Sequence, residues 1–404
     1  MSKSLKFIKR VGFLALGGFI FPSILLSQSS PSKTFGSGVS FIASDSSFSL
    51  KFAARFQSLY TFTAPADRLN SPARTSEFLI RRARLKFDGF AVNPKLVYKL
   101  ELGLSNRDIG SIVPETGSTS RIFLDAVLKW NFHKGFTLWA GQTKLPGNRE
   151  RVISSGNMQF VDRSLVNGRF NIDRDVGFQL HHEHKLGKIV VREIASLSQG
   201  EGRNITVPNI GGYDYTGRLE VLPFGAFTKD GDYIGSDLER EKKPKLSLAA
   251  SYDFNDGASR QRGQLGSFNK DSTGAYVLSN LTTIFLDAVF KYKGYSLSIE
   301  YANTKGTNIN AISKFGKSVG YFYAGQGFVV QSGYLFKRNF EFALRYTNIQ
   351  PNANINQKAI TEYTLGFSRY IVGHKLKIQS DLSYQNIANT GNQLIYRMQF
   401  DIHF

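Results

Sequence analysis

The 404-residue chain has no cysteine, only two tryptophans and only three methionines. Without cysteine it forms no disulfide bridge, holds no metal through thiolates and offers no N-terminal cysteine for lipid attachment. Beyond its first 30 residues it also lacks any apolar run near the roughly 20 residues that a membrane-spanning helix needs. Its mean hydropathy is −0.22. These absences exclude an exported helical membrane protein and a disulfide-stabilised one.

Acidic residues are scarce as well, since 31 Asp and Glu face 51 Lys and Arg. Four of the basic residues precede an apolar run from Val11 to Leu26, and small polar residues follow at 27–30. This order is typical of a secretory signal peptide, so we predict that residues 1–28 direct export through the Sec pathway and are then removed. The alternative is an uncleaved anchor helix, for which a run that contains Pro22 is short.

The mature chain would keep 47 basic and 31 acidic residues, a net charge of +16. Such an excess often indicates binding to nucleic acid or anionic lipid. A nucleic-acid module would gather its charge in one patch or arm, whereas the basic residues here recur along most of the chain. We therefore predict a pathway for small anions, with no nucleic-acid partner and no cofactor.

The end of the chain alternates strictly between apolar and polar side chains. Six apolar residues share one face of the predicted strand: Leu394, Tyr396, Met398, Phe400, Ile402 and Phe404. A strand has a period of two residues, so polar side chains occupy the opposite face. The closing strand of a transmembrane barrel needs this pattern because lipid lies on one side and water on the other. A soluble β-sandwich is the competing fold, but it requires no aromatic strand at its free end.

Fifteen further segments can be read as strands, and short joins alternate with long polar connections. The predicted strands cover residues 48–62, 77–89, 95–104, 120–130, 136–144, 175–184, 188–197, 212–222, 245–254, 281–292, 295–304, 326–336, 339–348, 360–370, 374–385 and 394–404. We therefore predict an all-β chain that forms a 16-stranded antiparallel transmembrane β-barrel at 48–404, after a short periplasmic extension at 29–47. One join breaks the pattern, because 223–244 falls where a short periplasmic turn belongs. Either the strand count slips there or one turn is long.

The predicted strand at 77–89 carries a row of cations. Arg82, Arg84 and Lys86 recur every second residue, about 7 Å apart, and cannot face lipid. We interpret them as a lumenal ladder for anions; the alternative is that they pair with acids such as Glu101 and only stabilise the wall. Four apolar residues are expected on the opposite face: Leu79, Ala83, Leu85 and Phe87. Arg81 falls on that apolar face, so we expect it to snorkel or to lie at a rim.

Residues 121–130 match residues 283–292 at seven of ten positions. In both, the aspartate and the lysine share one face, while an isoleucine, a leucine, an alanine and an aromatic residue share the other. A duplicated site is one interpretation. Similar strands under the same barrel constraints are the other, and we favour it.

Several motifs resemble the phosphate-selective porin O/P family of Gram-negative outer membranes. The residues that carry the resemblance are Phe78-Leu-Ile-Arg-Arg-Ala-Arg84 with Gly89, Leu124-Asp-Ala126, Gly141-Gln-Thr-Lys-Leu-Pro146, Arg149-Glu-Arg151, Asp162-Arg-Ser164 and Arg174-Asp-Val-Gly177. The resemblance runs from about residue 48 to the C-terminus, is strongest in 78–177 and is weak between about 200 and 280. It implies a trimeric, water-filled outer-membrane channel that passes anions, with phosphate or polyphosphate as candidates.

The third long connection, 145–173, is where a general porin folds a loop inward to narrow the pore. It carries four arginines against three acids, Glu150, Asp162 and Asp173, so its net charge is only +1. Half or more of these arginines are expected in pairs that fix its shape. The candidate residues of the anion pathway are Arg82, Arg84, Lys86, Lys144, Arg149, Arg151, Arg163, Arg169 and Arg174.

Enzyme motifs are weak. His182 and His184 share a strand face while His181 points away, which favours a polar strand end over a metal site. Gly316-Lys-Ser318 resembles the end of a phosphate loop, but Ala311 stands where its first glycine belongs. No nucleophile elbow or zinc-protease motif occurs. We predict no enzyme and no metal; the alternative is a barrel that serves as a platform for an enzyme or adhesin.

Overall fold

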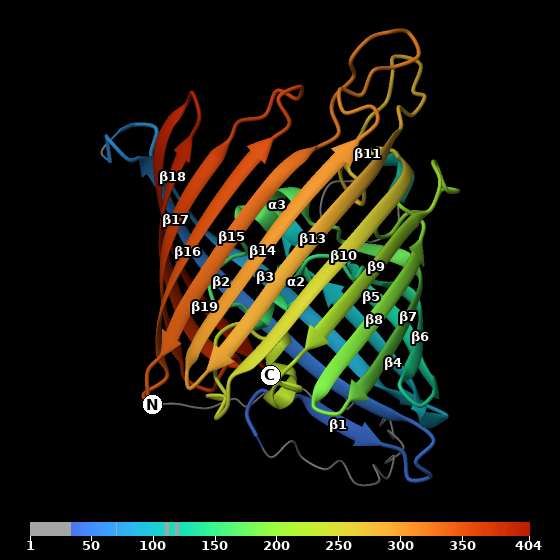
Figure 1. The fold of residues 1–404 in the computed structure, drawn as a ribbon, viewed down its shortest axis with the longest axis vertical. Coiled ribbons are helices and arrows are strands. Elements are labelled where there is room, and N and C mark those ends of the chain that lie inside the picture. The colour runs from blue at the N-terminus through green and yellow to red at the C-terminus, as the bar shows by residue number, and fades with distance from the viewer. Residues whose placement is uncertain (1–33, 70, 110–112, 118–120) are drawn as a thin grey trace, which may run out of the picture.

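The chain forms a closed antiparallel β-barrel (Figure 1). This computed structural model describes residues 34–69, 71–109, 113–117 and 121–404, so the predicted signal peptide at 1–28 lies outside the described residues. The barrel strands are β2 (Ser49–Pro65), β3 (Thr75–Ala91), β4 (Asn93–Gly103), β5 (Phe123–His133), β6 (Phe136–Lys144), β7 (Arg174–Leu186), β8 (Ile189–Ser198), β9 (Asp214–Leu222), β10 (Lys245–Ala258), β13 (Ser279–Tyr292), β14 (Tyr295–Gly306), β15 (Gly325–Leu335), β16 (Phe340–Pro351), β17 (Ile360–Tyr370), β18 (Leu376–Ile387) and β19 (Gly391–His403).

Each of the 16 predicted segments overlaps one of these strands, and each strand pairs with its neighbour along the chain. The barrel closes where β19 pairs with β2, from Gln393 opposite Pro65 to His403 opposite Arg55. The backbone N–H of Phe404 then donates to the Ala54 carbonyl at 2.8 Å. The prediction of a 16-stranded antiparallel barrel is confirmed, with the alternating C-terminal segment as its closing strand.

Period-two alternation sets the two faces of the wall. On the outer face, Phe178 is 57% exposed and Tyr363 is 55% exposed. Polar residues such as Gln179 and Glu362 alternate with them along the same strands and are buried inside the barrel. In the described part of the chain, no helix has the length and apolar character to cross a bilayer.

The two ends of the barrel differ in the length of their connections. One end, which we call the short-turn end, carries turns of a few residues and the C-terminus. The opposite, long-connection end carries most of the long loops, including the hairpin of β11 (Arg260–Arg262) and β12 (Leu265–Phe268). The 223–244 connection belongs to the short-turn end and contains η3 (Thr228–Tyr233). The strand count is therefore correct, and one short-end turn is long.

Several short elements outside the barrel wall were not expected. β1 (Val39–Ile42) extends the edge of β2 beyond the reach of β19, with Val39 opposite Phe52. α1 (Asn106–Ile109) and η1 (Pro114–Thr116) lie in the connection after β4. Such short elements carry no periodic pattern from which the sequence could predict them.

A β-bulge in β3 changes the predicted faces of that strand. Gln57 of β2 lies opposite Arg82 but the next residue, Ser58, lies opposite Ile80, so Arg81 is an extra residue in β3. A bulge adds one residue to one strand and shifts the alternation beyond it. Ile80 is consequently 54% exposed on the outer face and Leu79 faces inward. The placements of Leu79 and Arg81 on the apolar face were wrong for this reason.

The 145–173 segment contains α2 (Arg149–Val152), η2 (Ser155–Asn157) and α3 (Leu165–Phe170). It makes hydrogen bonds to inner-face residues far along the chain; the amide of Asn148 donates to Glu300 at 2.9 Å and the backbone N–H of Val161 to Asp381 at 3.2 Å. Its apolar side chains pack against inner-face side chains of β13–β16 in one buried cluster, whose members include Leu145, Val166, Phe170, Ile172, Phe285, Ala302, Val329 and Ile349. We call the inner faces of β10 and β13–β18, which the segment contacts, the covered half of the barrel.

Wall glycines make room for this contact. At Gly327 of β15 a Cβ atom would lie 2.6 Å from a ring carbon of Phe170, and at Gly366 of β17 it would lie 2.8 Å from the Phe160 ring. Real Cβ atoms do not approach so closely, so a larger residue at either position requires the Phe170 or Phe160 ring to move.

Candidate functional site

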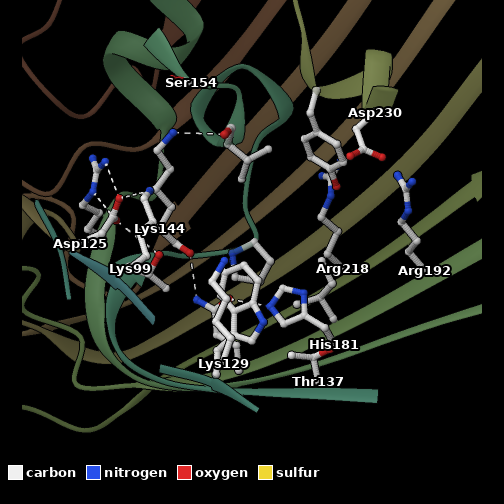
Figure 2. A pocket seen from close by; sticks show the side chains of 18 of the residues that line it. Lys99, Asp125, Lys129, Thr137, Lys144, Ser154, His181, Arg192, Arg218 and Asp230 are labelled. Carbon is white, nitrogen blue, oxygen red and sulfur yellow. Dashed lines mark hydrogen bonds and ion pairs between the residues drawn. The ribbon is translucent and has the colours of Figure 1, made fainter. Parts of the chain in front are cut away.

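The inner faces of β3–β9, which we call the cavity half, border a cavity of about 820 Å³. The 145–173 segment and the 223–244 connection complete its lining. Figure 2 shows its side chains converging on one space from the wall and from these two segments. Eight basic residues line it, against four acidic ones: Arg84, Lys86, Lys99, Lys129, Lys144, Arg174, Arg192 and Arg218, with Glu101, Asp125, Glu183 and Asp230.

Most of these cations are paired with carboxylates. Arg84 donates to Glu101 at 2.9 Å and to Asp108 at 2.9 Å, so the expected partner Glu101 is confirmed. Lys86 contacts Asp88, although its side chain is 44% exposed. Arg82 is 3% exposed and does not line the cavity; it donates to Gln57 and to Asp162. The two arginines of the predicted ladder are therefore compensated.

Lys99 and Arg174 share one aspartate. Lys99 Nζ lies 2.5 Å from Asp125 Oδ2, and Arg174 Nε donates to Asp125 Oδ1 at 2.9 Å. Asp125 belongs to the repeated segment in β5, and its counterpart in β13, Asp287, accepts from Arg149 at 2.8 Å. Both aspartates face inward. Asp287 holds Arg149 of the 145–173 segment, whereas Asp125 holds Arg174, the first residue of β7 directly after that segment.

Lys129 and Lys144 differ from the other cavity cations, because neither contacts a carboxylate of the described residues. Lys129 Nζ lies 3.5 Å from the centroid of the Trp139 ring, which His181 stacks against at 4.1 Å. Lys144 Nζ donates to the carbonyl oxygens of Val152 and Ile153 at 3.1 and 3.2 Å. A ring face and two carbonyls fix these ammonium groups while leaving their charges uncompensated. Figure 2 shows both beside the cavity.

The bulge residue Arg81 joins Arg82 in binding Asp162 of the 145–173 segment. Arg81 donates to Asp162 at 2.9 Å and Arg82 donates at 3.3 Å. Burial alone would raise the pKa of the Asp162 carboxyl, but the two guanidiniums hold it below its usual range. This carboxylate therefore stays charged and fastens the segment to β3.

The four arginines of the 145–173 segment have different surroundings. Arg149 is 1% exposed and Arg151 pairs with Asp173. Arg163 donates to the carbonyls of Glu150 and Ile153 at 2.8 Å, and Arg169 lies 6.0 Å from the Tyr323 ring. None of the four lines the cavity. Of the nine predicted pathway residues, the cavity brings together four: Arg84, Lys86, Lys144 and Arg174.

Arg149 is the centre of a buried charge cluster with equal numbers of basic and acidic residues. Its members are Arg149, Arg192, Arg218, Glu220, Asp232 and Asp287. Burial alone would lower the pKa of Arg149, but Asp287 and Glu220 raise it well above its usual value. Asp232 comes from the 223–244 connection, whose Tyr233 donates to Glu220 at 2.6 Å. The cluster therefore joins the barrel wall to both segments.

The 223–244 connection also contacts the wall and the 145–173 segment directly. Lys291 of β13 donates to the carbonyls of Gly231 and Ile234 at 2.7 Å. The backbone N–H of Gly235 donates to the Asn157 carbonyl at 2.6 Å. This unusually long turn therefore lies inside the short-turn end, where it borders the cavity.

Sequence reasoning missed Lys99, Lys129, Arg192 and Arg218 of the cavity. It also missed a group of arginines on the long connections, Arg121, Arg203, Arg260 and Arg262, whose hydrogen bonds go to carbonyl or hydroxyl oxygens. Burial, with other arginines nearby, lowers the pKa of Arg203 and of Arg260 to about 10. Both remain charged near neutral pH. One sequence pattern could have identified Lys129, since it shares the polar face of its strand with Asp125.

A family model described as phosphate-selective porin O and P matches residues 51–402. An uncharacterized protein of Aquifex aeolicus (strain VF5) is 23% identical over 392 residues, which is 88% of this chain and 87% of that protein. The barrel is similar to an anion-selective porin from Comamonas acidovorans, with a TM-score of 0.55 and 11% identity over 88% of this chain and 100% of the other.

Two further solved structures share the fold. The trimer form of OmpT, an outer membrane protein of Vibrio cholerae, has a TM-score of 0.52 and 12% identity over 88% of this chain and 99% of its own. OprB of Pseudomonas putida has a TM-score of 0.53 and 12% identity over 88% of this chain and 94% of its own. At these identities the likeness shows the fold alone.

Proposed function

Because the chain belongs to the phosphate-selective porin O and P family, we propose that the porin channel it forms in the outer membrane selects anions, and that they pass along the cavity half of the barrel. The observation that carries this proposal is the twofold excess of basic over acidic residues around the cavity. Charged rings and surfaces of one sign set ion selectivity in water-filled pores. The family and the fold point to a channel and not to an enzyme.

The selectivity of the proposed path depends most on its uncompensated cations. Lys129 and Lys144 form no ion pair with a carboxylate of the described residues, so no direct partner offsets their charge beside the cavity. A unit charge a few ångströms from an ion is worth about 1 kcal/mol even at the dielectric constant of water, or about fivefold in local anion concentration. The paired cations contribute less. The arginines on the long connections would raise the anion concentration at the mouth.

Two inner segments define the shape of this path. The 145–173 segment occupies the covered half, and the 223–244 connection borders the cavity at the short-turn end. Together they would constrict the pore and direct anions past β3–β9. Phosphate or polyphosphate is the substrate class that the family description supports. We further propose assembly as a homotrimer, export through the Sec pathway with removal of 1–28, and a periplasmic position for 29–47.

Planar-bilayer recording tests the proposal. The reversal potential in a KCl gradient should show preference for chloride, and Lys129→Gln should reduce that preference by up to about fivefold at low salt. Lys188→Gln is the matched control, because Lys188 is exposed in the turn between β7 and β8 and does not line the cavity. Phosphate should block the chloride current. Cation preference, or no conductance from correctly folded protein, would refute the proposal.

A further inference from the structure

The outer face of the wall carries one polar cluster that the channel does not explain. His182 and His184 of β7 alternate with inward residues and follow Phe178 and Leu180 on the outer face, which are 57% and 41% exposed. Glu193 of β8 lies directly opposite His182. Charged side chains on the lipid face of a barrel destabilise it, with a smaller cost near the interfaces. The three side chains lie close to the short-turn end, and their grouping there requires a reason.

Their geometry brings three metal-binding groups together. His182 Nδ1 lies 2.6 Å from Glu193 Oε2, and His184 Nδ1 lies 3.8 Å from the same oxygen. All three side chains offer ligand atoms within 4.8 Å of one another. The His182 ring stacks on Phe136 of β6 with centroids 4.0 Å apart, which fixes its orientation. Within the described residues, this is the only group of three or more histidine, aspartate or glutamate side chains whose ligand atoms lie within 4.8 Å of one another.

One nitrogen of the cluster lacks a hydrogen bond. His184 Nδ1 is buried and has no hydrogen-bond partner among the described residues, although a carboxylate lies 3.8 Å away. A tetrahedral Zn²⁺ ion with bonds of roughly 2.0–2.2 Å separates its ligand atoms by about 3.3 Å. The two observed separations, 2.6 and 3.8 Å, lie on either side of that value. A cation between the three groups would satisfy the nitrogen and offset the carboxylate charge.

We propose that His182, His184 and Glu193 bind one divalent transition-metal ion of the Zn²⁺ class, with the remaining coordination position open to water. Two imidazoles and one carboxylate are ligands that zinc and cobalt accept. A groove of about 610 Å³ on the outer face is lined in part by Ala195, Gly217, His182 and Glu193. The ion would join β7 to β8 beside the turn that links them. Of the three proposed ligands, His182 also lines the cavity, whereas His184 and Glu193 do not.

Cobalt titration of untagged, chelator-treated protein in detergent tests the proposal, because bound Co²⁺ gives visible ligand-field absorption. We expect one Co²⁺ per chain, displaced by Zn²⁺. Replacing one ligand by His184→Ala or Glu193→Gln should weaken binding by at least about tenfold, since even outer-shell changes cost that much. His181→Ala is the matched control, because that side chain is on the same strand but faces inward against Trp139. Its cobalt affinity should equal that of the wild type.

Zn²⁺ stabilisation gives a second readout. A ligand that binds only the folded state raises the unfolding temperature by mass action, so Zn²⁺ should raise the temperature of heat modification on SDS gels for the wild type and His181→Ala, and for neither ligand variant. Semi-native gels without metal verify that every variant is folded. The proposal is overturned if the folded wild type shows no Co²⁺ absorption at millimolar metal, or if the ligand variants bind as tightly as the wild type.

Discussion

The covered half and the cavity half of the barrel use inward side chains differently. On β13–β16 the inner face includes Phe285, Val329 and Ile349, which the apolar side chains of the 145–173 segment cover completely. On β3–β9 the inner face is charged and borders the cavity. A barrel interior is therefore not uniformly wet: apolar residues face inward where a segment packs on them. Charged residues fasten that segment in both halves, and in the cavity half they also line the path.

Substitution of Arg82 and Arg84 tests whether the charges of the cavity half stabilise the fold or select the passing ion. Replacing both with Glu would set new carboxylates beside Asp162, Glu101 and Asp108, which now accept from these arginines. Buried acids without a cation cost several kcal/mol each, about 3–5 for each broken pair. We expect the largest loss here, seen as a low folded fraction on semi-native gels. A double mutant that folds normally and loses anion preference would restore the ladder interpretation.

Arg149→Ala should separate the two inner segments from the wall. The substitution leaves Glu220, Asp232 and Asp287 with less positive charge and should destabilise the protein by about 3–5 kcal/mol. Heat modification should occur at a lower temperature, and channel recordings should show larger or noisier currents. Arg169→Ala on the same segment is the control, since among the described residues Arg169 forms no ion pair and lies 6.0 Å from the Tyr323 ring. Equal stability of the two variants would contradict the role of the buried charge cluster.

Gly327→Ala probes the apolar contact of the covered half. Its Cβ would lie 2.6 Å from the Phe170 ring, so that ring must move, at a cost of about 1–3 kcal/mol. Gly217→Ala is the matched control on the outer face of β9, where a Cβ meets nothing within 4 Å. Chemical denaturation in detergent compares the two. If Gly327→Ala is as stable as Gly217→Ala, the segment does not press against β15.

Asp88→Asn should increase the anion preference of the cavity half, because it removes the carboxylate that pairs with Lys86. The Lys86 side chain is 44% exposed, and exposed pairs contribute at most about 1 kcal/mol, so stability should hardly change. The lysine would then join Lys129 as an uncompensated cation. Anion preference should rise by about twofold at low salt and by less at high salt. A fall in preference, with folding intact, would show that Lys86 does not face the ion path.

Alternation along the strands was sufficient to predict all 16 strands and the closing strand. It could not reveal the bulge at Arg81, because the extra residue is visible only against the register of β2. Alternation also assigned inward positions by polarity. It therefore could not predict that the distant 145–173 segment packs on Phe285. The pairing of Arg149 with Asp287 joins residues 138 positions apart in sequence, and one sequence carries no signal for such a contact.

The covered half also has an electrical consequence. Sixteen strands fix the circumference of the wall, but the resistance of the proposed path depends on the free cross-section beside β3–β9 and on the charges that line it. A member of this fold with the same number of strands and a shorter 145–173 segment would therefore conduct more current through an equally wide wall. Single-channel conductance therefore reports how much of the barrel lumen is filled by the polypeptide, and not how wide the barrel is.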